Sequence, residues 1–180
     1  SDGIFDVYQN FTLFVSNVND APLIVSDPNP SAMQDGLYQY QIDAIDEDND
    51  TLHFSLLQRP LGMSINPGTG LAQWVPTNED VGMHEVIAVV NDSQEAVQQS
   101  FTILVSNVND VPNIVSLPNT TAIEGVPYSY DVNAVDVDTD EISYSLIQSP
   151  NGMTINPYSG LINWLPGPAT VGVQVIIVRA

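Results

Sequence analysis

The segment PLGMSINPGTGLAQWVP, residues 60–76, returns as PNGMTINPYSGLINWLP at residues 150–166. The two copies are offset by 90 positions, and the same offset aligns residues 11–20, FTLFVSNVND, with residues 101–110, FTILVSNVND. A fixed period of this length is the sequence signature of a repeat architecture. The 180-residue chain therefore spans two periods of 90 residues.

The pattern within one period is that of β-strands. Short runs rich in Val, Ile, Tyr and Phe alternate with polar residues, as in 38–42 and 52–56, and breaker clusters such as 48–50 separate them. About seven such strands in about 90 residues predict an all-β chain of tandem immunoglobulin-like Greek-key β-sandwiches. Trp74 and Trp164 are expected to fill the core between the sheets, with ligand binding as the alternative.

The charge balance limits the partners that the chain can have. It carries 22 Asp and Glu against two basic residues, for a formal net charge of −20. Nucleic acid and anionic lipid would be repelled, so cations are the natural counterpart, although an acidic surface tuned for solubility or a salty environment is the alternative. Cysteine is absent, which excludes disulfides and thiol chemistry, and no apolar run approaches the ~20 residues that span a bilayer.

Two short acidic segments, residues 46–50 and 136–140, are candidate metal sites. Each places three carboxylates at alternate positions, where several oxygens can turn to one side and bind a hard cation such as Ca²⁺. The EF-hand pattern is excluded, because its required Gly and closing Glu are replaced by other residues. A solvated Asp/Asn turn is the alternative. The carboxylates are those of Asp46, Asp48 and Asp50 in the first segment and of Asp136, Asp138 and Asp140 in the second.

The motif Ala-x-Asp-x-Asp, joined to Val-Asn-Asp-x-Pro at the repeat ends, resembles the cadherin superfamily. The Pro-x-Gly-Met and Gly-Leu-x-x-Trp segments resemble, more specifically, the dystroglycan-type cadherin-like and Putative Ig repeats of large prokaryotic surface proteins. The resemblance implies that an Asn-Asp linker shares calcium with the acidic loop of the following repeat. Carried over, the linker ligands are Asn19 and Asp20 for the first loop and Asn109 and Asp110 for the second, with Glu124 matching an early cadherin Glu.

Departures from the family pattern predict weaker sites. The cadherin Leu-Asp-Arg-Glu segment is missing from residues 77–80 and 167–170, and Gln34 stands where the other repeat has Glu124. With fewer acidic ligands, we expect one ion per junction rather than three.

The repeat boundaries do not coincide with the ends of the given sequence. Residues 1–22 match a closing strand and linker, residues 23–112 form one repeat, and residues 113–180 stop before their own closing strand. An open sandwich exposes an apolar groove and unpaired backbone. We expect either the continuing chain or a strand from about Phe5 to Val15 of another copy to fill it. The donated apolar residues would be Phe11, Leu13 and Val15.

These features favour a non-enzymatic role outside the cell. The leading hypothesis is a module of an extracellular head-to-tail fibre or repeat stalk, at a cell surface or in a secreted filament. The alternatives are an adhesion module that recognises a glycan or protein, and an accessory domain of a secreted carbohydrate-active enzyme. No nucleophile motif or phosphate loop is visible, and His53 and His84 lack partners at metal-ligand spacing. Direct membrane insertion and nucleic-acid binding are not expected.

Overall fold

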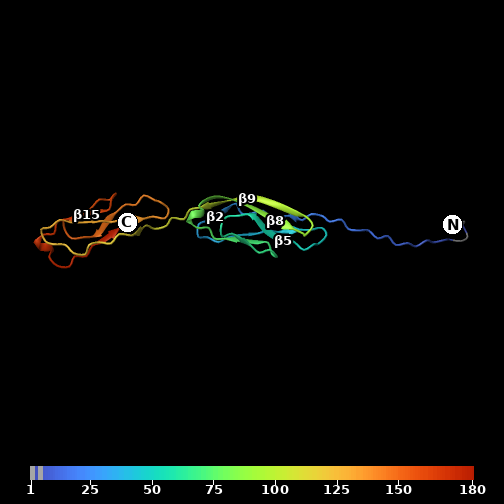
Figure 1. Ribbon diagram of the computed structural model, residues 1–180, viewed down its shortest axis with the longest axis horizontal. Coiled ribbons are helices and arrows are strands. Elements are labelled where there is room, and N and C mark those ends of the chain that lie inside the picture. The colour runs from blue at the N-terminus through green and yellow to red at the C-terminus, as the bar shows by residue number, and fades with distance from the viewer. Residues whose placement is uncertain (1–2, 4–5) are drawn as a thin grey trace. The chain divides into compact units, whose positions relative to one another are not determined.

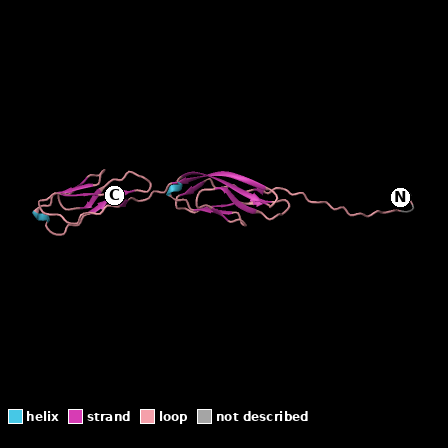
Figure 2. Ribbon diagram, in the orientation of Figure 1, coloured by secondary structure: helices cyan, strands magenta, loops and turns pink. Residues whose placement is uncertain are grey.

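The computed structural model describes residue 3 and residues 6–180. The chain divides into two compact units, Ser1–Ser106 (unit 1) and Asn107–Ala180 (unit 2). Both units consist of β-strands and loops, with one short 3-10 helix in each, η1 (Asn78–Asp80) and η2 (Pro168–Thr170) (Figure 2). The expected all-β fold class is confirmed. Within the described residues, no helix has the length and apolar character needed to cross a membrane.

Unit 1 is a sandwich of two main sheets. The four-stranded sheet has the order β2-β9-β8-β5, and these four strands are labelled in Figure 1. The opposing sheet has the order β3-β7-β6, and a short pair, β1-β4, lies at the start of the unit. The strands are β1 (Leu23–Ile24), β2 (Ser31–Met33), β3 (Tyr38–Gln41), β4 (Ala44–Ile45), β5 (His53–Gln58), β6 (Ser64–Ile65), β7 (Leu71–Trp74), β8 (Gly82–Asn91) and β9 (Ala96–Ser106).

The first segments of unit 1 change partners along their length. β1 pairs with β4, whereas β2, a few residues later, pairs with β9 in the four-stranded sheet. Likewise β3 pairs with β7, and β4 immediately after it pairs with β1. Corners at which a chain switches sheets are common in sandwiches. These corners divide the edge strands into short pieces, so the described residues of unit 1 form nine strands where the sequence suggested about seven.

β9 lies between β2 and β8 in the four-stranded sheet and pairs with both. It pairs antiparallel with all of β8, from Gly82↔Val105 to Asn91↔Ala96, and parallel with β2 on its other side. Alternate residues of β9 face the core, as the two-residue period of a strand requires, and Ile103 and Val105 are fully buried. The core of unit 1 is therefore closed by a strand that comes last in the sequence of the repeat.

Unit 2 repeats this plan without a counterpart of β9 among residues 107–180. Its sheets are β11-β15-β14, β13-β16 and β10-β12. The strand that corresponds to β8 keeps only three paired residues, and the segment that corresponds to β2 forms no strand. The strands are β10 (Asn113–Ile114), β11 (Tyr128–Asp131), β12 (Ala134–Val135), β13 (Ser145–Gln148), β14 (Thr154–Ile155), β15 (Leu161–Trp164) and β16 (Ile177–Arg179).

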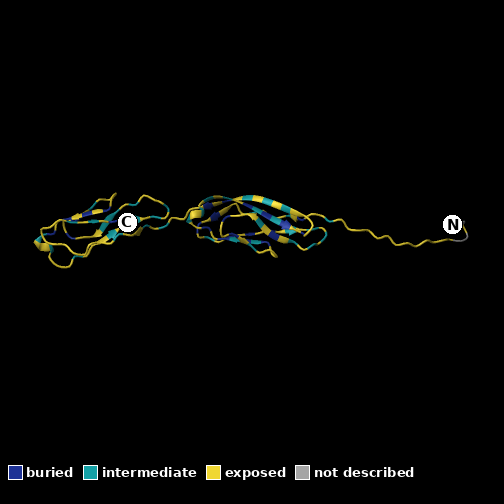
Figure 3. Cartoon of the chain, in the orientation of Figure 1, coloured by how far each residue is buried: buried dark blue, intermediate teal, exposed yellow. Residues whose placement is uncertain are grey.

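The missing strand leaves the core of unit 2 more exposed, and Figure 3 shows less dark blue there than in unit 1. Val86 of β8 has 0% of its surface exposed, whereas Ile176, its counterpart, has 38%. The sheet β11-β15-β14, which retains all the strands of its unit 1 counterpart, is well packed. Trp74 and Trp164 are buried as expected, and each indole Nε1 donates to a backbone oxygen, that of Leu61 (3.1 Å) or Asn151 (3.2 Å).

The recurring glycine before Leu71 and Leu161 is required by close packing. Gly70 has a φ of +74°, and a Cβ there would lie 2.6 Å from the carbonyl oxygen of Ile42 and 3.0 Å from the ring of Phe54. We expect Gly70→Ala to lower the free energy of unfolding of unit 1 by roughly 2–4 kcal/mol, through left-handed backbone strain and overpacking. Denaturant unfolding measures this change. Gly68→Ala is the matched control, because a Cβ at Gly68 meets nothing closer than 3.7 Å, and equal losses in both variants would contradict the packing argument.

Candidate functional site

The first acidic loop is held in shape by one of its own carboxylates. Asp46 Oδ1 accepts hydrogen bonds from the backbone N–H groups of Asp48 (2.9 Å) and Asp50 (3.1 Å), and Asn49 takes a φ of +60° at the turn. This arrangement is the Asx turn that Asp favours. It brings carboxylate oxygens of Asp46, Asp48 and Asp50 within 4.8 Å of one another.

The linker that precedes unit 1's first strand binds to this loop. The backbone N–H of Asp20 donates to Asp48 Oδ2 (2.7 Å), and the side-chain amide of Asn17 donates to Asp48 Oδ1 (2.7 Å). The expected meeting of the Asn-Asp linker with the acidic loop therefore occurs for Asp20 and Asp48, through the backbone N–H of Asp20.

A fourth carboxylate, that of Asp92 in the turn between β8 and β9, lies close enough to the first site to add to the effect of burial in raising the pKa of Asp50. Asp92 Oδ1 accepts from the N–H groups of Gln94 (2.7 Å) and Glu95 (2.6 Å), and its Oδ2 accepts from the side chain of Asn19 (3.0 Å). These bonds, led by that from Glu95, lower the pKa of Asp92, so it is ionised at neutral pH. Sequence reasoning missed both Asp92 and Asn17.

Asp50 experiences the opposite electrostatic effect. Burial raises its pKa, and the neighbouring carboxylates of Asp46, Asp48 and Asp92 raise it further. A carboxyl with a raised pKa in the folded state opposes folding when it is ionised. The loop therefore carries repulsion that a bound cation would remove.

Unit 2 reproduces the loop and its linker contact. Asp136 Oδ1 accepts from the N–H groups of Asp138 (2.8 Å) and Asp140 (3.4 Å), and the N–H of Asp110 donates to Asp138 Oδ2 (2.6 Å). Carboxylate oxygens of Asp136, Asp138 and Asp140 again lie within 4.8 Å of one another. Asn109, which directly precedes Asp110, donates from its side chain to the carbonyl oxygen of Asp110 (2.7 Å).

The oxygens left over in each loop fit a hard cation. Asp46 Oδ2 in unit 1 and Asp138 Oδ1 in unit 2 are buried and have no hydrogen-bond partner. A buried carboxylate oxygen without a donor is costly unless something positive satisfies it. Calcium binds six to eight such oxygens, so the donor set suits calcium and water together.

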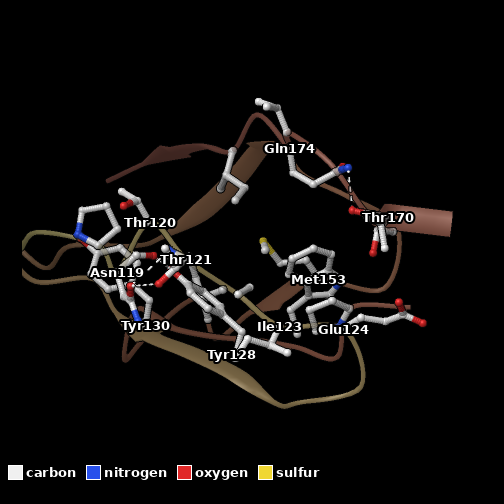
Figure 4. Close-up of a pocket in the computed structure, with 18 of the residues that line it drawn as sticks. Asn119, Thr120, Thr121, Ile123, Glu124, Tyr128, Tyr130, Met153, Thr170 and Gln174 are labelled. Atoms are coloured by element: carbon white, nitrogen blue, oxygen red, sulfur yellow. Dashed lines mark hydrogen bonds between the residues drawn. The ribbon is translucent and has the colours of Figure 1, made fainter. Parts of the chain in front are cut away.

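Glu124, the remaining expected ligand, lies elsewhere in unit 2. It is exposed and lines a large groove rather than belonging to the group formed by Asp136, Asp138 and Asp140. In Figure 4 it appears at the edge of this groove, beyond Ile123.

The groove occupies the position that β9 fills in unit 1. Its volume is about 830 Å³, and Tyr128, Tyr130 and Met153 line it together with Ile176 and Val178. Figure 4 draws the labelled tyrosines and Met153 among the side chains that line it. Its two sides are the segment 121–123 and the segment 172–178, which correspond to β2 and β8.

The expected donor residues are not packed within unit 1. Residues 6–20 form no strand, and the side chains of Phe11, Leu13 and Val15 are all about 80% exposed. Phe5, at the start of the expected donor strand, lies outside the described residues. A segment similar in sequence to β9 thus presents its apolar side chains to solvent, which is unfavourable for an isolated chain.

Comparison with known families gives one match. The model of a family described as Putative Ig domain matches residues 21–106 and 111–180. A search of curated proteins finds no match to the chain.

Solved structures share the fold at low sequence identity. Human protocadherin-24 EC1-2 is 18% identical, with 90% of this chain and 95% of that chain covered and a TM-score of 0.61. Drosophila N-cadherin EC1-4 is 17% identical, with 89% and 48% covered and a TM-score of 0.57. An endo-fucoidan hydrolase from glycoside hydrolase family 107 aligns with a TM-score of 0.44 and 16% identity, with 87% of this chain and 26% of that chain covered. The cadherin-like, Ig-like fold is therefore confirmed.

The effect of Asp50→Asn on the melting temperature should depend on whether calcium is present. Without divalent cations, Asp50→Asn should raise the melting temperature, because it removes an ionised group that opposes folding. With millimolar calcium, the same variant should show a smaller calcium-induced rise than the wild type, because it loses a ligand. Calorimetry in chelator and in calcium measures both effects. Asp27→Asn, an exposed change outside the loop, should alter neither; a wild-type melting temperature that ignores calcium and chelator would refute the cation site.

Proposed function

The chain belongs to the Putative Ig domain family, and from this premise we propose that it is a structural module of an extracellular head-to-tail fibre or repeat stalk. In this role each open sandwich is completed by a closing strand from the next copy or from the continuing chain. Calcium at the acidic loops stiffens the junctions between repeats. The role is mechanical, and it requires no catalytic group.

One observation carries the proposal. Unit 2 has an open groove where unit 1 holds β9, and residues 6–16 are similar in sequence to β9 at an offset of 90. Unit 1 therefore supplies the template for how the groove would be filled. Because the donor segment and the acceptor groove lie at different ends of the sequence, donation from copy to copy would continue head-to-tail.

The template also identifies the face of the donor strand that would enter the core. In β9 the residues that face inward are at odd positions, and they include Phe101, Ile103 and Val105. Their counterparts are the expected donor residues Phe11, Leu13 and Val15. Each apolar side chain that becomes buried contributes roughly 1.5–3 kcal/mol, which in sum supports a durable joint.

Calcium would act at the linker that directly follows the donor strand. Asn17 and Asp20 bind to the first acidic loop directly after residues 6–16. A cation held by Asp46, Asp48 and Asp50 would fix the linker against unit 1 and limit its freedom. The entropy lost when the donor strand docks would then be smaller.

Donation and chain continuity differ in the size of the polypeptide. A filament built by donation dissociates on complete denaturation into 19.5 kDa chains if the 180-residue sequence is the subunit, whereas a continuous array yields a much longer polypeptide. Denaturing electrophoresis of the native material distinguishes the two.

We expect Leu13→Asp to abolish head-to-tail assembly of the 180-residue chain. The counterpart of Leu13, Ile103, is fully buried, and an aspartate at that position would place an unpaired charge in the core. Sedimentation velocity in calcium, followed by electron microscopy, measures the assembly.

Thr12→Asp is the control for this experiment, because Thr102, its counterpart in β9, is exposed. It should assemble like the wild type. A wild-type chain that stays monomeric at high concentration would contradict donation between copies, and loss of assembly in both variants alike would contradict the assigned face.

A further inference from the structure

The inner face of the donor segment contains one polar residue, Gln9. The inward-facing positions of β9 are 97, 99, 101, 103 and 105, and their counterparts in the donor are Val7, Gln9, Phe11, Leu13 and Val15. Four of these are apolar. A single amide in an otherwise apolar face needs a specific partner when it is buried.

Unit 1 shows what that partner is for Gln99, the counterpart of Gln9. The hydroxyl of Tyr40 donates to Gln99 Oε1 (2.8 Å), and Gln99 Nε2 donates to the carbonyl oxygen of Ser26 (2.8 Å). The same Tyr40 hydroxyl lies 2.7 Å from Ser26 Oγ. The ring of Tyr40 also meets Phe101 edge-on, at a centroid distance of 5.6 Å and an interplanar angle of 83°. Tyr40 therefore contacts two inward-facing residues of β9 at once.

Unit 2 holds the same receiving pair in place. The hydroxyl of Tyr130 lies 2.7 Å from Ser116 Oγ, and Ser116 Oγ accepts from the N–H of Asn133 (2.8 Å), as Ser26 Oγ does from Asp43 (2.9 Å). One hydrogen bond between two hydroxyls uses one of their two protons. In unit 1 the Tyr40 hydroxyl lies within donating distance of both Gln99 Oε1 (2.8 Å) and the carbonyl oxygen of Ser26 (3.0 Å); in unit 2 Tyr130 faces the open groove.

We propose that Tyr130 and Ser116 form a docking site for Gln9 and Phe11 of a second copy, and that this polar contact sets the register of the donated strand. Gln9 accepts from the hydroxyl of Tyr130 and donates to the carbonyl oxygen of Ser116. Phe11 packs edge-on against the ring of Tyr130. The inference rests on the proposed strand donation and adds the residue that selects the correct alignment.

Register is otherwise weakly defined in such a strand. A slip by two residues keeps the inward face inward and exchanges one apolar residue for another. In this donor, however, the same slip places Val7 or Phe11 opposite the Tyr130 hydroxyl and moves Gln9 to an apolar position. Two buried polar groups then lose their partners, and the misaligned joint is disfavoured. In the aligned joint the pairings Val86↔Phe101 and Ala88↔Gln99 become Ile176↔Phe11 and Val178↔Gln9.

The test measures the critical concentration for assembly of the full 180-residue chain by sedimentation. Gln9→Leu should raise it about tenfold, because the Tyr130 hydroxyl loses a buried partner. Asn10→Leu is the matched amide-to-leucine control on the outward face, where Ser100 of β9 is exposed, and should change it by less than about twofold. Gln9 is exposed in the free chain, so neither change disturbs the folding of a unit.

A second variant tests the contact itself. Tyr130→Phe should also raise the critical concentration, and Gln9→Leu combined with Tyr130→Phe should raise it by less than the product of the two single effects, since both changes remove the same hydrogen bond. If the wild type assembles and Gln9→Leu leaves the critical concentration unchanged, or if the two effects multiply, the docking site is wrong while donation stands. If the wild type does not assemble, both donation between copies and the docking site are wrong.

Discussion

A β-sandwich of this kind depends on the strand that closes its larger sheet. In unit 1 that strand is β9, which pairs with β8 on one side and β2 on the other. It supplies hydrogen bonds to two strands and covers the core from one edge. Unit 2 has the same sequence plan with no such strand among its residues, so the two units form an internal comparison. The residues facing the gap, such as Ile176, Tyr128 and Tyr130, are the ones that lose burial relative to their counterparts Val86, Tyr38 and Tyr40. Burial raises the pKa of Tyr38, to about 12, and also that of its counterpart Tyr128.

The acidic loops and the open groove are linked by the chain itself. The linker residues Asn17 and Asp20 follow the exposed segment 6–16 and bond to Asp48, so the segment leaves unit 1 from a fixed point. Like charges gathered at that point favour a cation, and the buried unpartnered oxygen of Asp46 is the most specific sign of one. In the proposed function, the linker that follows the donor strand is held at the acidic loop by electrostatic interactions, and the strand itself is held by burial in the next copy.

Much of the fold could be predicted from the sequence because it repeats. The offset of 90 residues fixed which segments are equivalent, and strand periodicity with buried tryptophans fixed the sandwich class. The three-carboxylate loops were also predictable, because Asp-x-Asp-x-Asp in a turn gathers its oxygens locally. Asp92 and Asn17 were not, because their role depends on tertiary neighbours: the pairing of His53 with Asn91 brings the β8–β9 turn to the acidic loop. Gln9 was missed because its role depends on a tertiary contact, that of Gln99 with the Tyr40 hydroxyl, and not on the apolar pattern of the strand.

The most direct test of the account is a disulfide that can form only in the aligned joint. The chain has no cysteine, and Glu85 pairs with Thr102 in unit 1, so the counterparts Val175 and Thr12 should lie opposite each other between two copies. Paired strand residues lie within the Cα separation that a disulfide allows, ~4.4–6.8 Å. Mixing the Thr12→Cys chain with the Val175→Cys chain under mild oxidation should give a crosslinked dimer, whereas pairing Thr12→Cys with Val173→Cys, two residues out of register, should not. Equal crosslinking in both mixtures, or in neither, would contradict strand donation in this register.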